Sequence, residues 1–197
     1  SSGAPAGNIT PPIHEELVPK PISPYGASKL SCEGYCSAYK HSFGIDTIVL
    51  RFSNVYGPLS QHKNSVVAKF IKEILRGKTL ETYGDGHQTR DFIHVDDLVN
   101  AILQSSKANG AGGEVFQIAT NKETSINDII EILKSIFSER QSIGIDVKRG
   151  KERIGDMKRN YSDISKAANL LSWKPTKDLI EGLKETVEYF LIETSNE

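Results

Sequence analysis

Tyr25 and Lys29 have the residue types and the spacing for proton transfer. They stand four positions apart, directly after Pro24, and in a helix this separation puts both side chains on one face. A phenol and an ammonium group each titrate near pH 10 in isolation, but a positive charge one turn away favours the phenolate. A phenolate can accept a proton from a substrate hydroxyl while a hydride leaves the same carbon. A packed tyrosine beside a solvated lysine gives the same pattern, so the pair alone does not define a function.

The composition argues against several other classes of protein. The chain has 197 residues, 38% of them hydrophobic and 25% charged, with a formal net charge of -1. This balance gives no general attraction to nucleic acid or to an acidic membrane, so any anion site must be local. No apolar run approaches the roughly 20 residues that span a bilayer. Cys32 and Cys36 predict free thiols, no metal site and a reducing, cytoplasmic location.

Strands and helices are predicted to alternate after a proline-rich loop over residues 1–24. We expect helices over residues 25–42, 66–75, 95–106, 125–137, 165–171 and 178–193, and strands over residues 45–52, 80–83, 115–119 and 145–148. Leu30, Tyr35, Ala38 and Tyr39 should supply part of an apolar face of the first helix, and Leu98, Val99, Ile102 and Leu103 should face inward on the third. This alternation predicts an α/β fold with a mainly parallel sheet.

The segments around Tyr25 and Lys29 favour a functional interpretation of the pair. Residues 23–29 read Ser-Pro-Tyr-Gly-Ala-Ser-Lys, and residues 1–4 read Ser-Ser-Gly-Ala. Both segments resemble the catalytic motifs of the extended short-chain dehydrogenases/reductases, the NAD-dependent epimerase/dehydratase family. The resemblance implies that Tyr25 and Lys29 are catalytic and also contact NAD. It also implies that Ser2 is the catalytic serine, whose hydroxyl hydrogen-bonds the reacting oxygen.

Further motifs follow in the order that the family shows. Asn54 lies in Arg-Phe-Ser-Asn-Val-Tyr-Gly-Pro, directly after a predicted strand, where ligands bind in open α/β sheets. A turn asparagine is the alternative. The resemblance implies that Asn54 contacts the phosphates of a nucleotide sugar and that Arg90 reaches its ribose or diphosphate. It places Arg153 on the diphosphate and Asp156 near the ribose, and the planar fork of an arginine suits such contacts.

The longest match, residues 83–97, also contains residues that we expect to be structural. One of Asp91, Asp96 and Asp97 can pair with an arginine and another can cap the next helix. His94 is expected to be packed or hydrogen-bonded and not to be a catalyst.

The family binds NAD through a Gly-x-x-Gly-x-x-Gly turn after its first strand, and these 197 residues contain no such turn. We therefore expect residues 1–60 to be a remnant of the Rossmann-like NAD-binding domain. Residues 61–197 should be mainly a substrate-binding region, with some segments returning to the Rossmann-like sheet. The expected fold is the C-terminal part of a doubly wound sheet plus a smaller α/β domain. Such a fragment of a longer enzyme is expected to be inactive alone.

The resemblance implies an NAD-dependent nucleotide-sugar epimerase, acting on UDP-glucose and UDP-galactose by transient 4-keto oxidation and hydride return. The family's dehydratases carry an Asp-Glu pair where this chain has Gly3 and Ala4, which favours an epimerase. A dehydratase, decarboxylase or reductase, or a non-catalytic nucleotide-sugar-binding module, remains an alternative. The family commonly forms dimers, which here implies a homodimer through the helices at 25–42 and 66–75.

Overall fold

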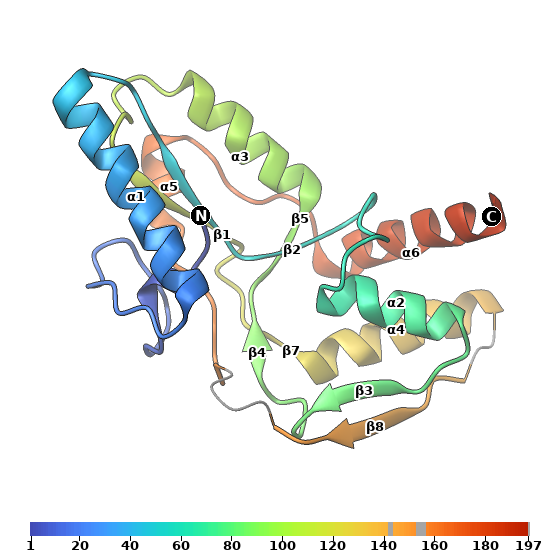
Figure 1. Ribbon diagram of the computed structural model, residues 1–197. Coiled ribbons are helices and arrows are strands. Elements are labelled where there is room, and N and C mark those ends of the chain that lie inside the picture. Colours follow the sequence, from blue (N-terminus) through green and yellow to red (C-terminus); the bar gives the residue numbers. More distant parts are fainter. Residues whose placement is uncertain (142–143, 153–156, 197) are drawn as a thin grey trace.

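The computed structural model describes residues 1–141, 144–152 and 157–196, shown in Figure 1. The helices are the 3-10 turn η1 (Ala4–Ala6), α1 (Pro24–Phe43), α2 (Val66–Leu75), α3 (Val95–Lys107), α4 (Ile126–Gln141), α5 (Ser165–Leu170) and α6 (Leu179–Asn196). The strands are β1 (Val49–Phe52), β2 (Asn54–Tyr56), β3 (Leu80–Tyr83), β4 (Thr89–Arg90), β5 (Phe92–His94), β6 (Val115–Ile118), β7 (Thr124–Ser125) and β8 (Val147–Gly150). No helix in the described part of the chain combines the length and the apolar content that crossing a bilayer requires.

The strand pairing confirms the prediction of a mainly parallel α/β fold. Strands β1 and β6, β2 and β5, and β3 and β8 pair in parallel, whereas β4 and β7 are antiparallel. Only Ser53 separates β1 from β2, so these two strands form one nearly continuous extended run. On its other side β1 meets the first residues of the chain, since Ser2 forms a parallel bridge to Phe52. The carboxyl end of β1 therefore lies beside Ser2 and directly precedes Asn54.

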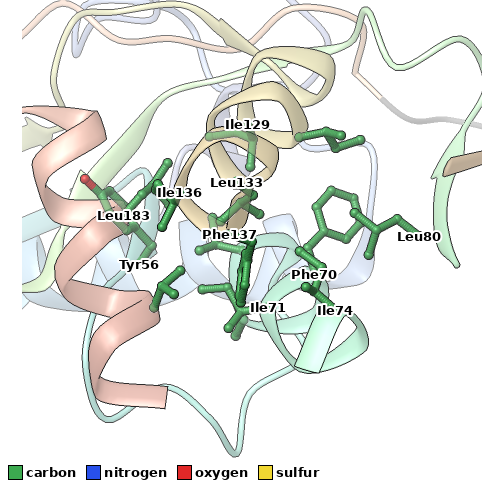
Figure 2. Packing of buried hydrophobic residues seen from close by; sticks show 14 of the residues in the cluster. Tyr56, Phe70, Ile71, Ile74, Leu80, Ile129, Leu133, Ile136, Phe137 and Leu183 are labelled. Carbon is green, nitrogen blue, oxygen red and sulfur yellow. The ribbon is translucent and has the colours of Figure 1, made fainter. Parts of the chain in front are cut away.

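Two apolar clusters support this arrangement. The larger cluster joins α2, α4 and α6 to β3, and Figure 2 shows side chains such as Ile71, Leu133 and Leu183 pointing toward one another. The second cluster joins β1 and β6 to α3 and α5 and is centred on Phe116 and Trp173. Each fully buried Leu, Ile or Phe stabilises the fold by roughly 1.5–3 kcal/mol. Helix α2 places its apolar residues in the first cluster or against it.

Helix α1 lies outside both clusters, on the same side of Figure 1 as β1. Of its predicted apolar face, Tyr35, Ala38 and Tyr39 are exposed. The buried residues of α1 are Gly26 and Glu33. The helix is attached through polar groups, which hydrophobic periodicity does not detect.

A buried ion pair joins α1 to β1. Arg51 donates from Nε to Glu33 Oε1 at 2.9 Å and from Nη2 to Glu33 Oε2 at 2.7 Å. Both side chains are about 95% buried, and the Ser1 hydroxyl donates to the same carboxylate at 2.6 Å. Two parallel hydrogen bonds between guanidinium and carboxylate fix orientation as well as distance.

Helix α3 also differs from its prediction. Val99, Ile102 and Leu103 were expected to face inward, but all three are exposed. The helix packs on the sheet through the neighbouring stripe, in which Ala101 and Ser105 are buried. Small residues on that stripe allow close approach of the helix, whereas the larger residues lie on its outer face.

The ion pair generates a stability prediction. Glu33→Gln leaves the guanidinium of Arg51 buried without a counter-charge and should lower the free energy of unfolding by about 3–5 kcal/mol. The double variant Glu33→Leu/Arg51→Met removes both charges and should lose less than the sum of its single variants. Urea unfolding followed by circular dichroism measures each value. Additive losses in the double variant would contradict the proposed coupling.

Candidate active site and ligand cavity

Tyr25 lies in the first turn of α1, at a well-defined helix start. Ser23 is the N-cap, and its hydroxyl accepts a hydrogen bond from the backbone N–H of Gly26 at 3.1 Å. Pro24 opens the helix, where its missing N–H costs nothing. The Tyr25 side chain is 56% exposed, and Lys29 Nζ lies 5.4 Å from the centre of its ring. The spacing thus places the ammonium group next to the phenol, while the catalytic role of both stays a prediction.

Ser2 lies close to this helix start. Its hydroxyl accepts a hydrogen bond from the backbone N–H of Ala4 at 3.1 Å, and η1 follows. A Cβ built on Gly26 would lie only 2.8 Å from the carbonyl oxygen of Ala4. The first turn of α1 therefore contacts the turn that follows Ser2, and glycine makes this approach sterically feasible. The structure brings the segments of Ser2 and Tyr25 together at the end of β1.

Asn54 and Arg90 line one cavity of about 220 Å³. Asn54 opens β2, and its backbone N–H donates to the carbonyl of Asp91 at 2.9 Å. Arg90 Nη1 donates to the carbonyls of Thr89 and Met157, both at 2.7 Å, which orients the guanidinium. The cavity is completed by the start of α2, by β3 and by Ile126 of α4. Two residues to which the family resemblance assigns substrate binding thus line the same cavity.

Three of the remaining predicted residues, Ser2, Tyr25 and Lys29, do not line this cavity. Ser2 bridges Phe52 at the end of β1, and Tyr25 and Lys29 lie in the N-terminal part of α1. Arg153 and Asp156 lie outside the described residues, and their roles stay predictions.

A second cavity, of about 320 Å³, adjoins the first and shares Tyr83 and Gln88 with it. Arg159, which also lines it, makes two hydrogen bonds of 2.7 Å to the carboxylate of Glu123. The guanidinium, with help from the Thr89 hydroxyl, lowers the pKa of Glu123 to about 2. Sequence reasoning missed Arg159 and Glu123, because neither belongs to a recognisable motif and 36 positions separate them.

Asp91 and Asp97 are structural, as the sequence suggested, but through other partners. Asp91 is buried and accepts hydrogen bonds from the Thr120 hydroxyl and from the backbone of Thr120, Asn121 and Ser162. Burial raises its pKa, and these hydrogen bonds oppose the shift. The carboxylate of Asp97 accepts in the same way from the residues at 176 and 177. The expectation that an aspartate caps the following helix was wrong, since the N-cap of α3 is His94.

His94 is packed, as predicted, and is 1% exposed. Its Nδ1 accepts a hydrogen bond from the backbone N–H of Asp96 at 3.3 Å, so the neutral ring carries its proton on Nε2. Nε2 has no hydrogen-bond partner and lies 3.8 Å from Glu185 Oε2. His94, Asp96 and Glu185 form a cluster of metal-ligand types among the described residues.

Parallel strand pairs, flanking helices and ligand-sized cavities beyond the strand ends define a Rossmann-like α/β protein. Residues 1–119 match the model of the NAD dependent epimerase/dehydratase family. The chain belongs to this family, which confirms the resemblance inferred from the motifs and, at the level of the family, NAD as the cofactor.

Curated relatives include the UDP-glucuronate 4-epimerase of Thermodesulfobacterium geofontis, 39% identical over 184 residues, with 91% of this chain and 54% of the relative covered. The UDP-glucose 4-epimerase of Mycolicibacterium smegmatis is 33% identical over 186 residues, and the match covers 92% of this chain and 58% of the relative. Among solved structures, the UDP-glucose 4-epimerase of Thermotoga maritima with UDP-glucose superposes with a TM-score of 0.91 at 36% identity, covering 98% of this chain and 62% of that chain. The chain thus spans little more than half the length of these curated relatives.

The contact at Gly26 predicts opposite effects for two glycines of α1. In a helix interior, alanine is more stabilising than glycine by about 1 kcal/mol. At Gly34 no atom lies within 4 Å of a new Cβ, so Gly34→Ala should raise stability by about 0.5–1 kcal/mol. At Gly26 the new Cβ meets backbone, and overpacking of about 1–3 kcal/mol should exceed the gain. Thermal unfolding of both variants shows whether each replacement raises or lowers the stability. Equal stabilisation by both would contradict the close approach at Gly26.

The burial of His94 predicts acid sensitivity. Burial lowers its pKa from the ordinary 6.5, with Lys177 acting in the same direction and Asp96 and Glu185 opposing. The unfolded chain therefore takes up a proton that the folded protein resists, and the free energy of unfolding should fall as pH falls below about 6.5.

Replacement of His94 by glutamine should flatten this dependence between pH 7 and pH 5. Denaturant unfolding at several pH values gives the two slopes. An unchanged slope in the variant would assign the acid sensitivity to other groups.

Proposed function

We propose that these residues form the proton-transfer and nucleotide-sugar-binding part of an NAD-dependent nucleotide-sugar epimerase. One observation carries the proposal: Asn54 and Arg90, from motifs 36 positions apart, line one cavity at the end of the strand that pairs with Ser2. Within this proposal, residues 1–60 belong to the cofactor domain, and residues 61–197 mainly hold the substrate.

The proposed chemistry assigns one task to each side chain. Tyr25 accepts the proton of the sugar 4-hydroxyl, Lys29 supplies the positive charge that favours the phenolate, and Ser2 hydrogen-bonds the reacting oxygen. NAD, when bound, supplies the hydride acceptor and donor. The geometry fits such a group, because the Tyr25 side chain is more than half exposed with the Lys29 ammonium beside its ring.

The neighbourhood of Ser2 supports an epimerase over a dehydratase. Residues 3 and 4, where the family's dehydratases carry an acid pair, are glycine and alanine. The carbonyl of Ala4 is held against Gly26, so this turn brings backbone and no carboxylate next to the tyrosine. UDP-glucose and UDP-galactose are the proposed substrates, in keeping with the relatives from Mycolicibacterium and Thermotoga.

A nucleotide-sugar-binding module without turnover is the second candidate. It is favoured by the cavity of Asn54 and Arg90, whose lining residues are distinct from Ser2, Tyr25 and Lys29. Binding to this cavity needs none of the proton-transfer residues.

For assembly and location we propose a cytoplasmic homodimer that uses α1. Tyr35, Tyr39 and Phe43 form an exposed aromatic row along this helix. Cys32 and Cys36 are free thiols on the same helix, and free thiols persist in a reducing compartment.

Isothermal calorimetry with UDP and UDP-glucose tests the proposed function. We expect the 197-residue chain to bind both ligands and Asn54→Ala to weaken binding by about tenfold, the value of one hydrogen bond to a charged group. The matched control is Asn169→Ala, an exposed asparagine on α5, which should leave the affinity unchanged. No binding of UDP by the unmodified chain would overturn the proposal.

A further inference from the structure

Lys69 lines the cavity of Asn54 and Arg90 but belongs to none of the family motifs. It lies on α2, four residues after the N-cap Ser65. Lys69 directly follows the first turn of α2. Ser65 and Val66 of that turn line the same cavity. Lys69 thus shares the cavity with the N-terminal turn of α2, whose backbone N–H groups give a partial positive charge.

Within the described residues, the Lys69 ammonium makes two weak contacts. Nζ lies 3.7 Å from Glu73 Oε1, one turn along the same helix. It also lies 5.8 Å from the centre of the Tyr83 ring, which lines the cavity as well. The Lys69 and Glu73 side chains are partly exposed, and an ion pair at this distance and a single cation–π contact each contribute little. A stronger anionic partner in the cavity can therefore recruit the ammonium at small cost.

The charge of the cavity favours such a partner. Lys69 and Arg90 are the basic residues of its lining, and Glu81 is the acidic one. Lys148 lies 3.6 Å from Glu81 and offsets its charge. In a protein of net charge -1, two cations and a helix N-terminus facing one cavity make a local site for an anion.

We propose that Lys69 is a specificity residue of this cavity, whose ammonium binds a phosphoryl oxygen of a nucleoside diphosphate. The inference rests on the proposed function and adds a cation to Asn54 and Arg90. Lys69 leaves Glu73 and Tyr83 when the ligand enters. The contact is a charge-assisted hydrogen bond, which is the stronger kind.

The test compares UDP with uridine, which shares the base and ribose but has no phosphate. Calorimetry gives the dissociation constant of UDP, and a chemical-shift titration gives that of the weaker uridine. Lys69→Met should weaken UDP binding about tenfold and leave uridine binding unchanged, and Lys69→Arg should retain most of the UDP affinity. The loss in Lys69→Met should shrink as salt is added, because screening weakens the contact in the unmodified chain.

Lys134→Met is the matched control. Lys134 is a half-exposed lysine of α4 that pairs with Glu131 on its own helix and lies outside this cavity lining. Its replacement should leave UDP affinity unchanged. Unaltered UDP binding by Lys69→Met, or an equal loss for uridine, overturns the role of Lys69. Failure of the unmodified chain to bind UDP instead overturns the proposed function, so the two failures are distinct.

Discussion

The buried ion pair between Glu33 and Arg51 sets the geometry of the candidate active site. Glu33 lies eight residues after Tyr25 on α1, and Arg51 lies three residues before Asn54 in the extended run. Because α1 belongs to neither apolar cluster, hydrophobic packing leaves the position of this helix along β1 undetermined. A bidentate guanidinium–carboxylate ion pair is directional, whereas apolar contact is not. The distance from the phenol to the ligand cavity therefore depends on this ion pair, together with the contact of Gly26 with the turn that follows Ser2.

A second constraint acts along residues 90–97, which cross the molecule from β4 through β5 into α3 (Figure 1). The carboxylate of Asp91 accepts hydrogen bonds from the backbone of two segments remote in sequence, and that of Asp97 accepts them from a third. Between them, His94 caps α3 with one ring nitrogen and leaves the other buried without a partner. Arg90 of the cavity thus begins a segment that is held in place by the hydrogen bonds of Asp91, His94 and Asp97. Rigid support of this kind keeps a binding group at one distance from its ligand.

The sequence predicted the long elements well, because helices such as α2 and α4 bury one continuous apolar stripe. The sequence-based prediction failed where packing depends on small or polar residues and where strands are short. The stripe of α3 was placed on the wrong side, since Ala101 and Ser105 pack more closely than Val99 and Leu103. Strands β4, β5 and β7 have two or three residues, too few to show a period of two. Motif order placed Asn54 and Arg90 in one site, whereas Lys69 and the Arg159–Glu123 pair depend on tertiary contacts that no local pattern encodes.

The single tryptophan occupies a position with a spectroscopic consequence. Trp173 is 1% exposed, and its indole N–H donates to the backbone carbonyl of Asp97 at 3.1 Å. An indole in such dry, fixed surroundings should emit at short wavelength and shift to the red when water reaches it. It belongs to the apolar cluster of α3 and α5, whereas the ligand cavity borders the other cluster. Intrinsic fluorescence therefore reports one half of this molecule, and any response of that signal to a ligand measures how firmly the two halves are joined.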